Sequence, residues 1–196
     1  MVIKEPASLT PILEFAESVH YEKKHAQQVA RLSLKFFDEL IDLHKLGAVE
    51  RFWLHAAALL HDIGWIGGRE EHHKCSRDMI LQSDVLPFCP EEKVIIALVA
   101  RYHRKALPDK DHRYYGTLDE IKKSVIDRLA ALLRIADGLD RQHIAAVENV
   151  RCEVADTTVK ILISGKLFDQ GEAKAAKKKS DLFERIFAKT VTLSVL

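Results

Sequence analysis

The chain has 196 residues, which suits one domain or one domain with a small appendage. Hydrophobic residues make up 47% and charged residues 30%, a balance that argues against disorder and predicts a sizeable core. The formal net charge of +1 excludes the global basic field of many nucleic-acid-binding proteins, so there is no strong nucleic-acid signal and any anion site must be local.

The cysteines and the lack of a long apolar segment bear on the cellular compartment. Cys75, Cys89 and Cys152 show no paired spacing, and an odd count fits reduced thiols better than a disulfide framework. The first residues lack the basic and then apolar pattern of a signal peptide, and no 18-residue apolar stretch occurs. We therefore expect a cytoplasmic protein that neither crosses a membrane nor carries a secretion signal.

The first predicted element is a helical stretch from about Thr10 to His44. Apolar residues recur in it at intervals of four, three, four and four after His25, at Val29, Leu32, Phe36 and Leu40. This spacing puts His25 on the apolar face. A histidine that points inward needs a partner, so His25 is either a core histidine bonded to a carbonyl or a ligand.

A second helix, predicted from about Val49 to Leu60, ends in the adjacent pair His61 and Asp62. Their side chains can reach one point beyond the last turn of the helix. A neutral imidazole nitrogen and a carboxylate oxygen together suit a divalent cation. Three glycines follow within Ile63 to Gly68, so this turn is either a plain loop or a segment whose backbone approaches a bound ion or ligand.

Two further predicted helices carry histidines at their ends. One runs to about Ser83 and begins with His72 and His73, and periodicity does not decide which of the two is a ligand. The other runs from about Glu91 to Lys105 and brings His103 to the inner end of its apolar face. A basic cluster near His103 is a solvated face or, beside a metal, a phosphate-binding group; it consists of Arg101, Arg104 and Lys105.

A long helix is predicted from about Leu118 to Leu139. Its apolar residues Ile126, Ala130 and Leu133 share a face with Asp137, so this carboxylate points inward. Burying an unpaired carboxylate costs enough free energy to consume much of a small domain's stability, and Asp137 therefore needs a cation. Asp140 and Arg141, close to the end of this helix, are interpreted as a surface pair.

The C-terminal part of the chain changes character. Alternating apolar and polar residues over 150–154 and 159–163 predict a β-hairpin, and a helix over 172–188 and a strand over 190–196 follow. We therefore predict a mostly α protein, with a helical metal-binding domain over residues 1–147 and a small α+β lobe over residues 148–196.

Four separate predicted helices thus each carry a residue that can bind metal and that faces inward. Four polar residues on apolar stripes would otherwise need four unrelated hydrogen-bonding solutions in one core. We expect these residues to converge on a metal site: His25, His61 with Asp62, His103, and Asp137.

The order of these residues resembles the HD superfamily of metal-dependent phosphohydrolases. His25 precedes the His-Asp pair by 36 residues, and Asp137 follows Asp62 by 75. Within the superfamily the chain is most similar to the C-terminal helical domain of the exopolyphosphatase and guanosine pentaphosphatase family. The similar stretches lie between about His20 and Arg141 and are specific in combination: Ala57–Gly64, His72–Ser76, Ala97–Ala106 and Leu132–Arg141. The resemblance implies an HD-domain helical bundle.

The resemblance also implies a ligand set. The principal metal ion would be held by His25, His61, Asp62 and Asp137. In members with two metals, His103 and one histidine of the His72 and His73 pair join, with Asp62 bridging. The family's pattern of a histidine three residues before a serine favours His73. One or two divalent ions are implied, and manganese, magnesium, nickel, cobalt, zinc and iron are not distinguished.

The implied function is a metal-dependent phosphohydrolase that acts on a nucleotide or another small phosphorylated compound through a metal-activated water. Asp62, next to His61, would orient or deprotonate the water. Lys74, Arg104 and Lys105 would neutralise phosphate charge. The resemblance leaves the type of phosphate bond open, and the sequence is compatible with a homo-oligomer.

Full-length members of the family carry an N-terminal actin-like phosphotransfer domain, for which this sequence has neither the length nor the glycine-rich phosphate loops. Polyphosphatase activity is therefore not carried over, and the complete ligand set favours catalysis by the helical domain itself. Two alternatives remain. One is a non-catalytic, metal-containing regulatory module that binds nucleotide, polyphosphate or a partner protein, and the other is a two-iron oxygenase on the same scaffold.

Overall fold

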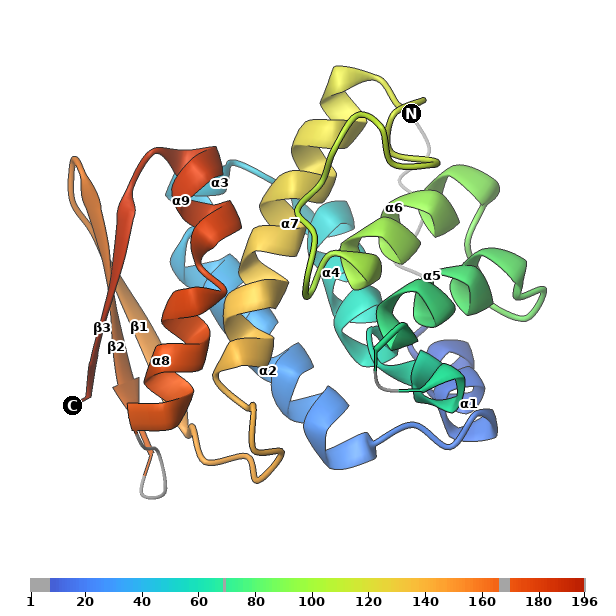
Figure 1. Ribbon diagram of the computed structural model, residues 1–196, viewed down its shortest axis with the longest axis horizontal. Coiled ribbons are helices and arrows are strands. Elements are labelled where there is room, and N and C mark those ends of the chain that lie inside the picture. The colour runs from blue at the N-terminus through green and yellow to red at the C-terminus, as the bar shows by residue number, and fades with distance from the viewer. Residues whose placement is uncertain (1–7, 69, 166–169, 196) are drawn as a thin grey trace.

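The computed structural model describes residues 8–68, 70–165 and 170–195. Helices make up most of it, and a small sheet lies at one end (Figure 1). This confirms the predicted mostly α protein with a small α+β C-terminal part. The helices before the sheet are α1 (Thr10–Ser18), α2 (Lys23–Glu39), α3 (Ile41–His44), α4 (Ala48–Leu60), the 3₁₀ helix η1 (Ile63–Gly67), α5 (His72–Gln82), α6 (Pro90–Arg101) and α7 (Glu120–Gly138).

The predicted helical stretch from Thr10 to His44 is broken into α1, α2 and α3. After α1 the backbone of His20 has a φ of 54°, in the left-handed region that ends a helix. The break lets α1 pack on α4, while α2 packs on α4, α7 and the sheet. Neither glycine nor proline lies between α1 and α2, so the sequence carries no local signal for this break.

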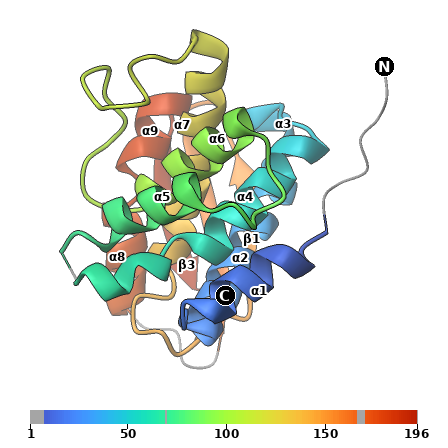
Figure 2. The same cartoon turned by 90° about the vertical axis from the view of Figure 1, so that its right-hand side faces the viewer.

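The helices from α4 to α7 follow the predicted order closely. Pro90 begins α6, as expected of a proline in a first helical turn. α6 ends at Arg101, four residues before the predicted end, so His103 lies in the turn that follows. α5 and α6 pack side by side, as both views show (Figure 2).

The C-terminal part forms a sheet of order β1-β2-β3 with two helices. β1 (Asn149–Val154) and β2 (Thr158–Ser164) pair antiparallel, and β3 (Thr190–Val195) joins β2 in parallel. The predicted hairpin is therefore confirmed, and so is the final strand as far as Val195; Leu196, its last predicted residue, lies outside the described residues. The predicted single helix over 172–188 is two helices, α8 (Gln170–Lys178) and α9 (Asp181–Phe187). At the break between them, the hydroxyl of Ser180 donates to the carbonyl of Lys177 at 2.7 Å.

One hydrophobic core joins both parts of the chain. It extends from Ile12 of α1 to Val191 of β3, and Val159, Ile161 and Ile163 add the buried face of β2. α8 and α9 pack on α7, next to the sheet (Figure 1). The predicted boundary near residue 147 lies in the segment before β1, and the core crosses it.

The structure bears on two expectations, one about the cysteines and one about membrane-spanning helices. Cys75, Cys89 and Cys152 are all free thiols. In the part of the chain that the structure describes, no helix has the length and apolar character needed to cross a lipid bilayer.

Candidate metal centre

The C-terminal ends of α4, α6 and α7 meet at one place. His61 directly follows α4, His103 lies just beyond α6, and Asp137 is in the last turn of α7. His25 joins them from the first turn of α2. The carbonyl end of a helix carries partial negative charge, so three such ends favour a bound cation at this place.

Three of the predicted ligands form a first group, which we define as His25, His61 and Asp62. The Nε2 atoms of His25 and His61 are 3.3 Å apart. Oδ2 of Asp62 lies 3.8 Å from the first of these nitrogens and 3.6 Å from the second. Both imidazoles have no solvent exposure.

A second group consists of Asp62, His72 and His103. The Nε2 atoms of the two histidines are 3.3 Å apart. Oδ1 of Asp62 lies 3.1 Å from Nε2 of His72 and 3.4 Å from Nε2 of His103. Asp62 therefore presents one oxygen to each group, which is the geometry of a bridging carboxylate.

The histidines are oriented as metal ligands are. Nδ1 of His61 is 2.8 Å from the carbonyl of Ala58, and Nδ1 of His103 is 2.7 Å from that of Ala100. An imidazole that donates from Nδ1 leaves the lone pair on Nε2, pointing into the groups. In each group this lone pair faces the Nε2 atom of a second histidine at 3.3 Å, so a proton or a cation must lie between the two nitrogens.

Asp62 supplies a second sign that a cation fits here. Its Oδ1 is buried, and although it lies 3.1 Å from Nε2 of His72, no contact among the described residues has the geometry of a hydrogen bond to it. Such an atom costs free energy unless it is paired. Imidazole nitrogens together with carboxylate oxygens suit a divalent ion of borderline or hard character, so the donor set of both groups fits one.

The protonation states of three of these residues, His61, His103 and Asp62, agree with this reading. Burial lowers the pKa of His61, and it lowers the pKa of His103 well below its ordinary value, so both are neutral at pH 7. Burial alone would raise the pKa of Asp62, but His61 and the neighbouring histidines outweigh it and hold this pKa well below its usual range. Neutral imidazoles and an ionised carboxylate are the forms that bind metal.

Asp137 lies beside the first group. Its Oδ1 is 3.5 Å from Nε2 of His25, and its Oδ2 pairs with the ammonium of Lys179. Burial opposes ionisation, yet Lys179 and His25 outweigh burial and keep the pKa of Asp137 well below its usual range. The prediction that this buried carboxylate needs a cation is met in part by a lysine from the C-terminal lobe.

The structure corrects the preferred histidine at the start of α5. His72, and not His73, faces Asp62 and His103. Nδ1 of His73 is buried without a hydrogen-bond partner in the described chain, and burial and Arg101 lower the pKa of His73 to about 4.

The close packing of η1 against α5 explains why His72, and not His73, faces Asp62. A Cβ on Gly64 would lie 2.3 Å from the carbonyl oxygen of His72, so only glycine lets η1 approach α5 so closely. Trp65 of η1 then stacks on the ring of His72, with centroids 5.1 Å apart, and its Nε1 donates to Oδ2 of Asp62 at 3.0 Å. Gly64 thus serves helix packing that holds two candidate ligands.

Asp140 is a second correction, because it is no part of a surface pair. It is completely buried, lies 2.8 Å from Nδ1 of His25 and accepts the backbone N–H of Ala145 at 2.7 Å. The ring of His143 stacks on that of His25, with centroids 3.7 Å apart. Asp140 follows Asp137 by three residues, a spacing that puts both carboxylates on one side of a helix end. This spacing could have indicated that Asp140 also points inward.

The three predicted phosphate-binding residues differ in position. Nη1 of Arg104 is 3.3 Å from Nε2 of His72, so its guanidinium lies at the second group. Lys74 pairs with Glu71 at 2.5 Å, and Lys105 donates to the carbonyl of Glu70 at 2.7 Å. Only Arg104 of the three contacts a residue of the groups in the described structure.

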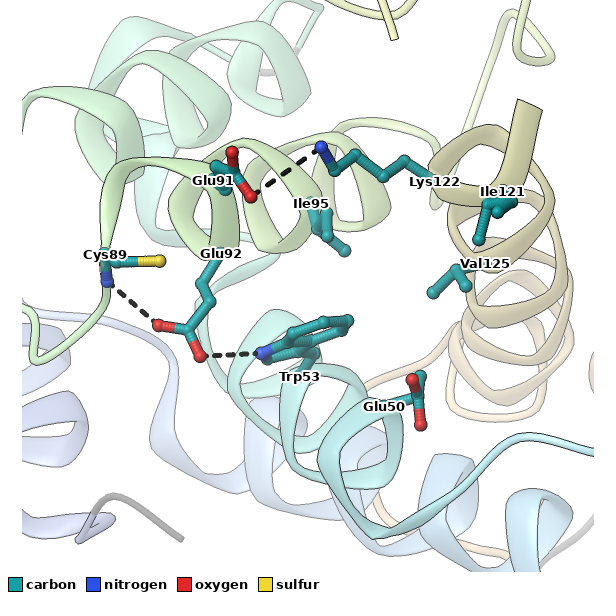
Figure 3. Close-up of a pocket in the computed structure, with 9 residues that line it drawn as sticks. All are labelled: Glu50, Trp53, Cys89, Glu91, Glu92, Ile95, Ile121, Lys122 and Val125. Atoms are coloured by element: carbon teal, nitrogen blue, oxygen red, sulfur yellow. Dashed lines mark hydrogen bonds and ion pairs between the residues drawn. The ribbon is translucent and has the colours of Figure 1, made fainter. Parts of the chain in front are cut away.

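A surface pocket lies at the opposite ends of the same helices (Figure 3). It is formed by the first two turns of α4, α6 and α7, and it contains none of the candidate ligands. Its polar residues include Glu50, Glu91 and Glu92 against the single cation Lys122. This charge is unfavourable for a phosphate, so the metal groups are the better candidate site.

Comparison with known proteins shows which family the chain belongs to. Residues 9–178 match the family described as Ppx/GppA phosphatase, domain III. The guanosine-5'-triphosphate,3'-diphosphate pyrophosphatase of Pseudoalteromonas translucida (strain TAC 125) is 30% identical over 124 residues, which are 62% of this chain and 24% of that protein. The chain thus spans about a quarter of the length of this relative. Because the match covers most of the helical body and both candidate groups, the chain belongs to the Ppx/GppA phosphatase domain III family.

Proposed function

We propose that the protein is a metal-dependent phosphohydrolase of the HD type, acting on a nucleotide or another small phosphorylated compound. The observation that carries the proposal is the pair of histidine groups that share Asp62. A bridging carboxylate between two metal positions is a common design of enzymes that hydrolyse phosphate bonds.

A divalent ion held by His25, His61 and Asp62, with a second on Asp62, His72 and His103, would lower the pKa of a bound water and polarise a phosphoryl oxygen. The low pKa of Asp62 keeps its carboxylate ionised, so it can orient that water. Trp65 fixes the carboxylate through its hydrogen bond to Oδ2. Arg104, beside His72, is placed to receive negative charge on the phosphate.

The side of approach for a substrate follows from burial. His25 and His61 are completely enclosed, whereas Trp65, which covers His72, is 42% exposed. We therefore infer that the phosphate approaches from the second group, between Trp65 and Arg104. The relative's name specifies a guanosine nucleotide with several phosphates, which supports nucleotides as the first compounds to test.

The test measures metal content and then hydrolysis. Elemental analysis of the untreated protein comes first, followed by phosphate or pyrophosphate release from a panel of nucleotides and phosphoesters with the metal restored. His61→Ala should abolish the release by removing a ligand. His55→Ala is the matched control, because His55 lies on the same helix outside both groups.

Two outcomes would contradict the proposal. Equal activity in the wild type and in His61→Ala would remove the metal groups from catalysis. Metal binding without release of phosphate from any compound would favour the non-catalytic regulatory module instead.

A further inference from the structure

Lys179 is a cation from the C-terminal lobe that reaches the candidate metal centre. It lies in the break between α8 and α9, and its ammonium pairs with Oδ2 of Asp137. The lysine side chain is 26% exposed and the carboxylate 10%. Lys179 therefore lies between the buried acid and solvent.

The position of Lys179 is fixed by packing on both sides of the break. On the α8 side of the break, Ala176 packs against Gly138 of α7. A Cβ on Gly138 would lie 2.7 Å from Cα of Ala176, so the backbones of α7 and α8 are in contact beside Asp137. After the break, the buried guanidinium of Arg134 on α7 donates to both oxygens of Asp181 at 2.9 and 3.0 Å. The lysine is thus built into the interface between α7 and the C-terminal lobe.

Asp137 has two competing uses. One oxygen faces His25, at the edge of the first group, and the other is held by Lys179. Asp137 is not one of the three residues of that group in this structure. A buried carboxylate must be paired, and the ammonium meets that need in the protein without metal.

We propose that Lys179 is exchanged between two partners: it neutralises Asp137 in the metal-free protein, and it binds the substrate phosphate once a metal ion takes Asp137. This inference rests on the proposed function and names a phosphate-binding residue of the same site. It also gives the C-terminal lobe a part in the active centre. The released ammonium, near enough to His103 of the second group to contribute to its lowered pKa, is then the lobe's cation for an anionic substrate.

The first test is the affinity of the metal-free protein for Mn²⁺, measured by calorimetry. Lys179→Met should bind Mn²⁺ at least about tenfold more tightly, because no ammonium has to be displaced. Lys178→Met removes the adjacent, exposed charge and should bind as the wild type does. Lys179→Arg keeps the charge and should also stay close to the wild type.

Equal or weaker Mn²⁺ binding by Lys179→Met would overturn the exchange, because a lysine that only positions Asp137 would weaken binding when removed. If Lys179→Met does not fold without metal, Lys179→Gln replaces it, since its amide can still donate to Asp137.

The second test is binding of inorganic phosphate to the Mn²⁺-loaded protein. Lys179→Met should weaken it roughly tenfold, the usual size of one charged hydrogen bond, and Lys178→Met should not. Unchanged binding would overturn the phosphate role. A wild type that binds no metal would overturn the proposed function as well, whereas metal binding and hydrolysis without these shifts would overturn this inference alone.

Discussion

The two histidine groups share Asp62 but differ in what surrounds them. The first group has two more carboxylates at hand, Asp137 and Asp140, and its imidazoles are wholly buried. The second group, among the described residues, contains only the shared carboxylate. It lies against Arg104 and is covered by the half-exposed Trp65. Because negative charge attracts a divalent ion and a guanidinium repels it, the first group should hold its ion more tightly. The second should meet the substrate.

The largest effect is expected from the residue that the two groups have in common. Asp62→Asn should remove metal from both positions and lower phosphate release by more than about 100-fold, since even partners of ligands cost 10- to 100-fold. Elemental analysis and the hydrolysis assay measure the two effects. Retention of a full complement of metal would show that Asp62 does not bridge.

The comparison itself is tested by removing one histidine from each group. His25→Ala should lose the tightly bound ion, whereas His72→Ala should keep it and still lose activity. Metal content after dialysis, measured beside phosphate release, separates the two variants. Equal metal loss in both would mean that the groups do not differ in affinity.

A smaller loss is expected when His25 keeps its place but loses its partner. Asp140→Asn removes the charge next to Nδ1 of His25 and should weaken metal binding to the first group about 10- to 100-fold. The matched control is Asp38→Asn, which changes a carboxylate on the same helix as His25 that pairs with Arg51 at the surface. Equal weakening in both would deny Asp140 a specific role.

A pH dependence follows for the metal-free protein. Burial lowers the pKa of His25, but Asp137 and Asp140 outweigh burial and raise it to about 10, above the unfolded value of 6.5. Its stabilising contribution is therefore complete below the unfolded pKa and is lost as pH rises toward 10. From about pH 7.5 to about pH 9 the free energy of unfolding should fall by up to about 1.4 kcal/mol per pH unit.

Urea unfolding at several pH values in the presence of a chelator measures this slope. Asp140→Asn should make it shallower, because one of the two carboxylates that raise the pKa of His25 becomes neutral. A wild-type slope of zero or of opposite sign would contradict the coupling.

The smallest effects concern the basic residues near the second group. Arg104→Ala should raise KM about tenfold, because a guanidinium at His72 can bind the phosphate directly. Lys74→Ala should change KM less, since its ammonium is exposed and held by Glu71. Steady-state kinetics of the two variants measures the difference, and a larger effect of Lys74→Ala would reverse their order.

Much of the site was predictable because helical periodicity reports which side chains point inward. His25, His61, His103 and Asp137 lie on apolar stripes, and all four are buried at one place. The choice between His72 and His73 was not predictable in this way. It depends on how η1 packs against α5 at Gly64, and neighbouring residues at a helix start have no period that separates them.

Asp140 and Lys179 show the same limit at longer range. Asp140 looked like a surface residue because its partner His25 is 115 residues away. Lys179 sits in an Ala/Lys-rich run, where a break in a predicted helix turns one lysine toward α7. Contacts of this kind arise from the packing of separate elements, and no local pattern contains them.

The sequence by itself determined the helical body, the hairpin and last strand, and the inward-facing ligand types, because hydrophobic periodicity and turn chemistry are local properties. The tertiary structure alone decided that Asp62 serves two groups, that His72 is the histidine facing it, and that the C-terminal lobe sends Lys179 to Asp137. These depend on distances between atoms of different helices, which only the packed core fixes.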